Sequence, residues 1–264
     1  MGEQKMFSHL PYNETIDPMN YFDSTVISQS RLTDNIYVLV AERKGADAHA
    51  GQFFMLKAWE RELTLMRPIS IFKANEHTLH FMYRVVGQGT RKLSELEAGD
   101  PISLLGALGT GYPVDQAAGR VALVGGGLGI PPLCQTAQEL TAKGVLVDAF
   151  LGYRDILFAM EEFEPYCANI FASTEVGDEG YRGYITDLLT PEKYDAVYTC
   201  GPEVMMRKVA ALCAEQKTPC WCSMEHRMAC GIGACLGCSI RTAEGMKRVC
   251  KEGPVFPANI LFQQ

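Results

Sequence analysis

The sequence has no long apolar run, no basic cluster and no recognisable export signal. A membrane-spanning helix needs about 20 consecutive apolar residues, and no window of the 264-residue chain provides them. Acidic residues outnumber lysine and arginine by 31 to 24, so we expect no membrane and no nucleic-acid partner, because no basic stripe offsets phosphate charge. The N-terminus lacks a basic segment followed by an apolar one, so we expect ten reduced cysteines and a cytoplasmic location.

The sequence also lacks the usual arrangements for acid–base or nucleophilic catalysis. Its five histidines show no metal-binding spacing such as H-E-x-x-H. No Ser-His-Asp set can be argued from spacing either. We therefore name no catalytic residue, and we expect bound cofactors to carry the chemistry.

The order of apolar patterns predicts two folded domains and a C-terminal appendix. Residues 1–20 look like a tail. Residues 21–119 contain many short strand-like runs, one short helix near residues 89–96, and turn signals, which favour a small antiparallel β-barrel. Residues 120–224 alternate strands with helices, which is typical of an α/β domain with a parallel sheet. Residues 225–264 hold an irregular cysteine-rich segment.

That segment contains four cysteines in the run MACGIGACLGCSIRTAEGMKRVC: Cys230, Cys235, Cys238 and Cys250. Their C-x4-C-x2-C spacing with a later fourth cysteine is the plant-type ligand pattern of a [2Fe–2S] cluster. Intervening glycines let the backbone turn tightly and direct N–H groups at the sulfurs. A zinc site remains the alternative, although zinc sites more often have two C-x2-C pairs.

Three short motifs in the predicted barrel suit a flavin nucleotide. An arginine at a strand start can bind a pyrophosphate with two parallel hydrogen bonds, a tyrosine can stack on a flat ring, and a glycine and threonine at a helix start can meet phosphate. These motifs are Arg67-Pro68-Ile69-Ser70, Met82-Tyr83-Arg84 and Gly89-Thr90. A purely structural barrel is the alternative explanation.

The α/β domain contains two motifs that suit a nicotinamide nucleotide, each following a predicted strand. Glycines between a strand and a helix let phosphate approach the backbone, and a thiol at a strand's carboxyl end can face a nicotinamide ring. The first motif consists of Gly125, Gly126, Gly127 and Gly129, and the second of Cys200, Gly201 and Pro202. Glu175, after another strand, is a candidate for a ribose hydroxyl and would favour NAD. A plain tight turn and a structural cysteine are the alternatives.

These motifs together imply a chain of three redox groups. A nicotinamide carries two electrons as hydride and a [2Fe–2S] cluster carries one, so a flavin must stand between them. The series RPIS, MYRVVGQGT, VGGGLGIPPL, CGP and MACGIGACLGC resembles the ferredoxin–NADP reductase superfamily from about residue 21 onward. VVGQGT, EHRMACGIGACLGC and CKEGPVF resemble the electron-transfer subunits of class 1B dihydroorotate dehydrogenases.

The resemblance implies FAD on the three barrel motifs, a cluster on the four cysteines, and NAD as the acceptor. It further implies a catalytic partner subunit that carries FMN and oxidises dihydroorotate to orotate in pyrimidine (UMP) biosynthesis, assembled as a heterotetramer with two of each subunit. Two alternatives remain at this point. One is the small flavin and iron–sulfur subunit of a ferredoxin–NADP transhydrogenase or a sulfhydrogenase, and the other is a zinc-stabilised binding module without redox activity.

Overall fold

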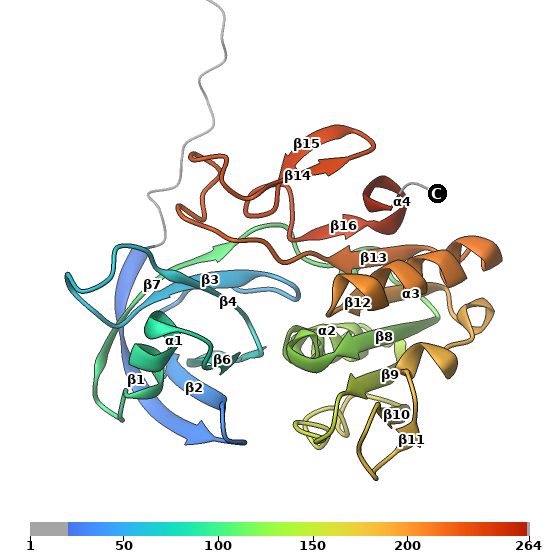
Figure 1. Cartoon of the computed structure of the whole chain (residues 1–264), viewed down its shortest axis with the longest axis horizontal. Helices are drawn as coiled ribbons and strands as arrows, with labels where there is room; N and C mark the ends of the chain where they lie inside the picture. The colour runs from blue at the N-terminus through green and yellow to red at the C-terminus, as the bar shows by residue number, and fades with distance from the viewer. Residues whose placement is uncertain (1–20, 263–264) are drawn as a thin grey trace, which may run out of the picture.

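The computed structural model describes residues 21–262, so the predicted tail at residues 1–20 lies outside the described part. The N-terminal half forms a seven-stranded antiparallel sheet in the order β4-β3-β7-β1-β2-β6-β5 (Figure 1). Its elements are β1 (Tyr21–Arg31), β2 (Ile36–Glu42), β3 (Phe53–Lys57), β4 (Arg67–Ser70), β5 (Lys73–Ala74), β6 (Thr78–Arg84), α1 (Gln88–Ser94) and β7 (Pro101–Leu108).

The sheet curls into a barrel because its two edge strands are consecutive in the chain. β4 ends at Ser70 and β5 begins at Lys73. The two residues between them bond to opposite ends of the sheet: Ile71 N donates to Gln52 O beside β3, and Phe72 N donates to His80 O of β6. The chain over residues 67–74 therefore forms two strands, and the break between them closes the barrel.

The second half forms a seven-stranded sheet in the order β11-β10-β9-β8-β12-β13-β16. All neighbouring pairs are parallel except β13 with β16, which is antiparallel. The elements are η1 (Val114–Gln116), β8 (Arg120–Gly126), η2 (Gly127–Gly129), α2 (Pro131–Ala142), β9 (Leu146–Tyr153), β10 (Asn169–Thr174), β11 (Tyr181–Arg182), η3 (Ile185–Asp187), η4 (Pro191–Lys193), β12 (Ala196–Cys200), α3 (Glu203–Gln216) and β13 (Cys220–Ser223).

Helices cover this sheet on both faces, as its apolar strands require. Alternate residues of β8 point to opposite sides: Val121 and Leu123 pack with α2, whereas Ala122 and Val124 pack with Val209 and Cys213 of α3. α2 lies between the sheet and the barrel (Figure 1). Its apolar side shares one core with Ile36, Phe72 and Met82 of the barrel, so the two domains are packed together.

The C-terminal segment is more regular than the sequence predicts and touches both domains (Figure 1). It contains β14 (Ser239–Thr242), β15 (Gly245–Arg248), β16 (Val255–Pro257) and α4 (Ala258–Leu261). β16 joins the α/β sheet as its last strand by pairing with β13. The predicted boundary at residue 225 therefore separates the cysteine loop from the sheet in sequence, but not in space.

No helix formed by residues 21–262 is long and apolar enough to cross a bilayer.

Candidate functional site

The four predicted cluster cysteines lie in a loop and hairpin that bring them together. β14 and β15 pair so that Ser239 faces Arg248, which places Cys238 beside Cys250. Cys250 N–H points at the Cys238 sulfur at 3.4 Å, and Cys235 N–H points at the Cys230 sulfur at 3.4 Å. The insert between the third and fourth cysteines is therefore a hairpin that closes the ligand set.

The surroundings of these thiols suit an anionic cluster. Gly233, at φ +81°, donates its N–H to the Cys250 sulfur at 3.1 Å, as predicted for glycines in this loop. Against the opposing effect of burial, N–H groups of the loop, led by that of Cys235, lower the pKa of Cys230 to about 7. Thiolates that accept N–H hydrogen bonds are the form that binds iron, so the residues present fit a [2Fe–2S] cluster.

The cysteines are arranged as two pairs, not as one tetrahedral set. Within residues 21–262, no three His, Cys, Asp or Glu side chains are gathered closely enough to hold a single metal ion. The backbone N–H of Cys235 points at the Cys230 sulfur, and that of Cys250 points at the Cys238 sulfur. Two pairs match the two irons of a [2Fe–2S] cluster better than the single ion of a structural zinc site.

The cysteine loop packs directly on the barrel. A Cβ atom on Gly231, which has φ +72°, would lie 2.8 Å from Cγ of Met55 in β3. Cys238 and Cys250 share a buried apolar cluster with Phe53, Met55 and other residues. Met55 faces Pro68 across the β3–β4 pair, so the cysteine loop is one strand away from the first predicted flavin motif.

The first and third predicted flavin motifs, 22 residues apart at Arg67 and Gly89, meet in space. A Cβ atom on Gly89 would lie 2.3, 2.5 and 2.7 Å from Nε, Cζ and Nη2 of Arg67, so any larger residue there would displace the Arg67 guanidinium group. Thr90 is buried, and its hydroxyl donates to Gly87 O at 3.1 Å while accepting from the N–H groups of Val86 and Gly87. That hydroxyl therefore shapes the start of α1, which limits its use for phosphate.

The remaining residues of the predicted flavin motifs differ in solvent exposure. Pro68, Ile69 and Ser70 are half-buried, and the Ser70 hydroxyl makes no hydrogen bond with the described residues. Met82 is buried at the contact with the α/β domain, and Arg84 is exposed.

The expectation that the Tyr83 ring stacks on a flavin is wrong. Strand alternation turns this side chain into the barrel core, where it is 2% exposed. Its hydroxyl donates to Gln29 Oε1 at 2.9 Å, and burial raises its pKa far above the ordinary value. Its neighbours in the motif, Met82 and Arg84, point the other way.

The two predicted nicotinamide motifs lie side by side at the carboxyl edge of the α/β sheet. Gly125 of β8 faces Cys200 of β12 across a parallel pair. From β8 the chain runs outward through β9 to β11 and then crosses back to β12. The gap between β8 and β12 is thus the point where strand order reverses, and open α/β sheets bind ligands in that crevice.

Three of the four glycines in the first motif lie in close contact with neighbouring residues of the protein. Cβ atoms on Gly125, Gly126 and Gly129 would lie 2.8, 2.7 and 2.2 Å from Ile130, Met205 and Cys200 respectively. Only Gly127, at φ +53°, faces open space. The prediction that these glycines leave room for phosphate therefore applies to Gly127, whereas the others let the loop close against β12.

The remaining residues of the second motif have clear structural roles. Burial raises the pKa of the half-buried Cys200 thiol to about 12, so it is protonated at neutral pH. Gly201 has φ +151° and touches Gly126. Pro202 is the N-cap residue of α3. Glu175 is exposed just after β10, two strands away from β8 at the same edge.

Flavin and nicotinamide motifs adjoin across the domain contact. Met82 shares a buried core with Ile130, which follows the glycine loop, and β6 contacts η2. α2 fixes this contact because Gln135 Oε1 accepts from Ala74 N–H at 2.8 Å and Glu139 Oε1 accepts from Ala50 N–H at 2.8 Å. Gln135 and Glu139 lie four residues apart on a helix that is mostly buried. This pair of polar residues is the feature of the sequence that could have indicated a contact between the domains.

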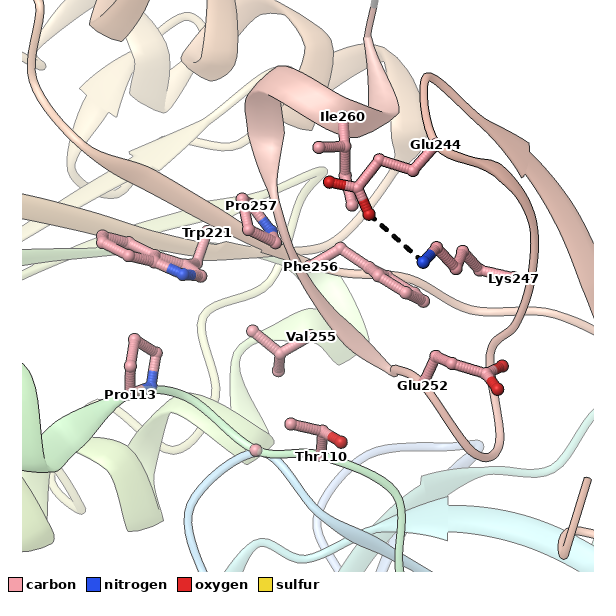
Figure 2. A pocket seen from close by; sticks show the side chains of 11 residues that line it. Thr110, Pro113, Trp221, Glu244, Lys247, Glu252, Val255, Phe256, Pro257 and Ile260 are labelled. Carbon is pink, nitrogen blue, oxygen red and sulfur yellow. Dashed lines mark ion pairs between the residues drawn. The ribbon is translucent and has the colours of Figure 1, made fainter. Parts of the chain in front are cut away.

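Two surface hollows in the described residues are lined by none of the motif residues. One, of about 310 Å³, has a floor that includes Trp221, Val255 and Phe256, and its rim carries a Glu244–Lys247 ion pair (Figure 2). The other, of about 380 Å³, lies between α1 and the β3–β4 loop. Neither hollow offers an alternative to the predicted nucleotide sites.

The cysteine-rich segment matches a known domain family. Residues 225–262 match the model of the iron-sulfur cluster binding domain of dihydroorotate dehydrogenase B. Proteins named "dihydroorotate dehydrogenase B (NAD(+)), electron transfer subunit" are similar over most of the chain. The one from Clostridium acetobutylicum is 43% identical over 89% of this chain and 95% of its own length. Those from Clostridium perfringens and Listeria monocytogenes are 41% and 40% identical, over 90% and 89% of this chain and 96% of their own.

Solved structures share the fold. An NADH-dependent reduced ferredoxin-NADP oxidoreductase structure, described in relation to flavin-based electron bifurcation, matches with a TM-score of 0.82 at 24% identity, covering 90% of this chain and 89% of that one. A ferredoxin NADP+ reductase from Neisseria gonorrhoeae matches with a TM-score of 0.58 at 18% identity, covering 78% and 94%. The predicted combination of antiparallel barrel, α/β sheet and C-terminal iron–sulfur segment is confirmed.

Proposed function

The chain belongs to the family of dihydroorotate dehydrogenase B (NAD(+)) electron transfer subunits, and on that premise we propose how it carries electrons. They enter from an FMN-containing catalytic subunit that oxidises dihydroorotate, pass through a [2Fe–2S] cluster and FAD, and leave on NAD+. The process serves pyrimidine biosynthesis. A flavin accepts or gives electrons singly or in pairs, which lets it join a one-electron carrier to a hydride carrier.

The observation that carries the proposal is the order of contacts through the molecule. The cysteine loop touches Met55 of β3, and β3 pairs with β4, which carries Arg67–Ser70. On the other side of the barrel, Met82 packs with Ile130 beside the glycine loop of β8. The three candidate sites thus adjoin in the order that electron transfer requires, with the barrel between the other two.

We assign the cluster ligands as Cys230 and Cys235 on one iron and Cys238 and Cys250 on the other. The pairing follows the two N–H to sulfur contacts, from Cys235 to Cys230 and from Cys250 to Cys238. Arg67 and Ser70 would bind the phosphates of FAD, since Nε and Nη2 of Arg67 and the Ser70 hydroxyl have no hydrogen-bond partner among residues 21–262. Arg84 is a further candidate for this role.

For NAD we assign the crevice between β8 and β12. Gly127 and Gly201 would lie along the nucleotide, and the protonated Cys200 thiol would face the nicotinamide ring. Glu175 would reach the distal ribose. The chain binds and orients the cofactors, and hydride exchange between them needs no general base.

Electrons would enter at the exposed side of the cysteine loop. Cys235 is exposed, and the neighbouring Leu236 and Ile232 are 63% and 38% exposed. Apolar side chains beside a one-electron site suit a partner protein, and we propose the FMN subunit there, in a heterotetramer with two of each subunit. We place the complex in the cytoplasm, where thiols stay reduced; all ten cysteines lie in the described residues as free thiols.

The test is the visible spectrum and coupled activity of the chain copurified with its partner. We expect flavin bands over a broad cluster envelope, bleached by NADH, and dihydroorotate-dependent reduction of NAD+. Cys235→Ser should remove the cluster envelope and the coupled activity, whereas Cys167→Ser, in the α/β domain, should keep both. Coupled turnover in a Cys235→Ser complex that lacks the cluster would refute the path.

The same assay separates the alternatives. A transhydrogenase or sulfhydrogenase subunit would show the same spectrum without dihydroorotate-dependent turnover. A zinc-stabilised module would be colourless, and family membership already counts against it.

A further inference from the structure

Arg67 is held in a way that leaves one edge of its guanidinium group available. Nη1 donates to Leu65 O at 2.5 Å and to Met66 O at 3.5 Å. Nε and Nη2 have no partner among residues 21–262, and these two atoms form an edge suited to bidentate binding of an anion.

Gly89 lies against the face of this group, not its edge. The three distances from a Cβ on Gly89 to Nε, Cζ and Nη2 differ by only 0.4 Å, from 2.3 to 2.7 Å. An approach in the plane from the Nε–Nη2 edge would leave Cζ farther away than both nitrogens, whereas the Cζ distance of 2.5 Å lies between the two nitrogen distances. The free edge is therefore not covered by Gly89, although the group cannot move towards α1.

A second contact comes from Trp59 in the β3–β4 loop. Cζ of Arg67 lies 5.2 Å from the centre of the Trp59 ring, within the range of a cation–π interaction. Trp59 is 7% exposed, and its indole N–H is buried without a hydrogen-bond partner among the described residues. An unpaired buried N–H costs stability, and tryptophan offers the strongest ring face for a cation–π contact, so the contact with Arg67 is a reason for tryptophan at this position.

We infer that Trp59 is a positioning residue for the flavin nucleotide, which acts by holding Arg67 with its free edge towards the phosphates. This inference rests on the proposed FAD site. It assigns Trp59 a part in distinguishing FAD from flavins without phosphate, because its effect passes through a group that binds phosphate only.

The test is a double-mutant cycle on the full chain, in which FAD affinity is measured by fluorescence titration after removal of flavin. We expect Arg67→Met to weaken FAD about 100-fold and Trp59→Leu to weaken it about tenfold. The double variant should bind about as weakly as Arg67→Met alone, since interacting residues are not additive. Riboflavin affinity should be unchanged by Trp59→Leu. The matched control is Trp221→Leu, which changes the other tryptophan of the chain. Trp221 lies on β13 of the α/β sheet, so this variant should leave FAD affinity unchanged.

The outcomes separate the inference from the site on which it depends. Multiplicative losses in the double variant, or an equal loss of riboflavin affinity in Trp59→Leu, would overturn the role of Trp59. FAD binding by Arg67→Met at the unmodified affinity would overturn the flavin site itself. If the leucine variant does not fold, Trp59→Phe provides the same cycle. Phenylalanine keeps a weaker ring face, so FAD affinity should fall about threefold. This loss of affinity should disappear when Arg67 is replaced by methionine.

Discussion

Gly129→Ala tests whether the contact between the glycine loop and β12 is needed for the nicotinamide site. A Cβ at this position would lie 2.2 Å from the carbonyl oxygen of Cys200, 2.3 Å from its carbonyl carbon and 2.5 Å from Gly201 N. Ordinary contact begins at 3.4 Å, so the loop and the strand end must separate by about 1.2 Å. Both partners are backbone, so no side chain can turn away to relieve the overlap.

The expected effects follow from that displacement. Overpacking of this kind typically costs about 1–3 kcal/mol, which urea denaturation would measure. A misplacement of about 1 Å in a site that orients reactants can lower a rate about 100-fold. We therefore expect NADH to bleach the flavin about 100 times more slowly in stopped-flow measurements, with FAD content unchanged because the barrel is not affected.

Gly144→Ala is the matched control. Gly144 lies in the turn between α2 and β9 of the same domain, at φ +78° with nothing within 4 Å of an added Cβ, so alanine meets no neighbour and costs only about 1 kcal/mol for the left-handed backbone. Flavin reduction in this variant should stay within a few fold of the unmodified rate. If Gly129→Ala reduced its flavin as fast as Gly144→Ala does, the loop–strand contact would not control the site.

Two further predictions concern stability. Gln135→Leu should lower the free energy of unfolding by about 1–3 kcal/mol, because it leaves the buried Ala74 N–H without its acceptor; the exposed Gln116→Leu should change it little. Burial raises the pKa of the Cys134 thiol to about 12, so above pH 9 the unfolded chain loses this proton before the folded one and stability falls towards pH 12. The slope is at most about 1.4 kcal/mol per pH unit, and urea titrations should show a smaller slope in Cys134→Ala; an equal slope would contradict the assignment.

The sequence limits the geometry of the candidate cluster site more than that of the nucleotide sites because the proposed cluster ligands are close in the chain. Cys230, Cys235 and Cys238 lie within nine residues, and their spacing alone limits the geometry. The hairpin that brings Cys250 back to Cys238 is evident only from the structure. The contact between Arg67 and Gly89 depends on how β5, β6 and α1 fold back, which no local pattern encodes.

The error at Tyr83 has a simple physical origin. A β-strand turns successive side chains to opposite faces, so a three-residue motif cannot present all its members to one ligand. The prediction assigned Met82, Tyr83 and Arg84 to one ligand. The pairing of β6 with β2 instead turns the Tyr83 side chain into the barrel core. Knowing which face of the strand is buried requires the neighbouring strands, and their order is not evident from one sequence.

The same reasoning explains why the C-terminal segment is not an independent appendix. Thr110, in the connection between the two domains, donates its N–H to Gly253 O at 2.6 Å and accepts from Val255 N at 3.3 Å. β16 completes the α/β sheet, and Gly231 presses on Met55 of the barrel. The cysteine loop is thus fixed to the barrel, the linker and the sheet at once. Because electron transfer depends on distance, a loop fixed to both domains keeps the cluster at one separation from the flavin motif while its outer side stays open to a partner.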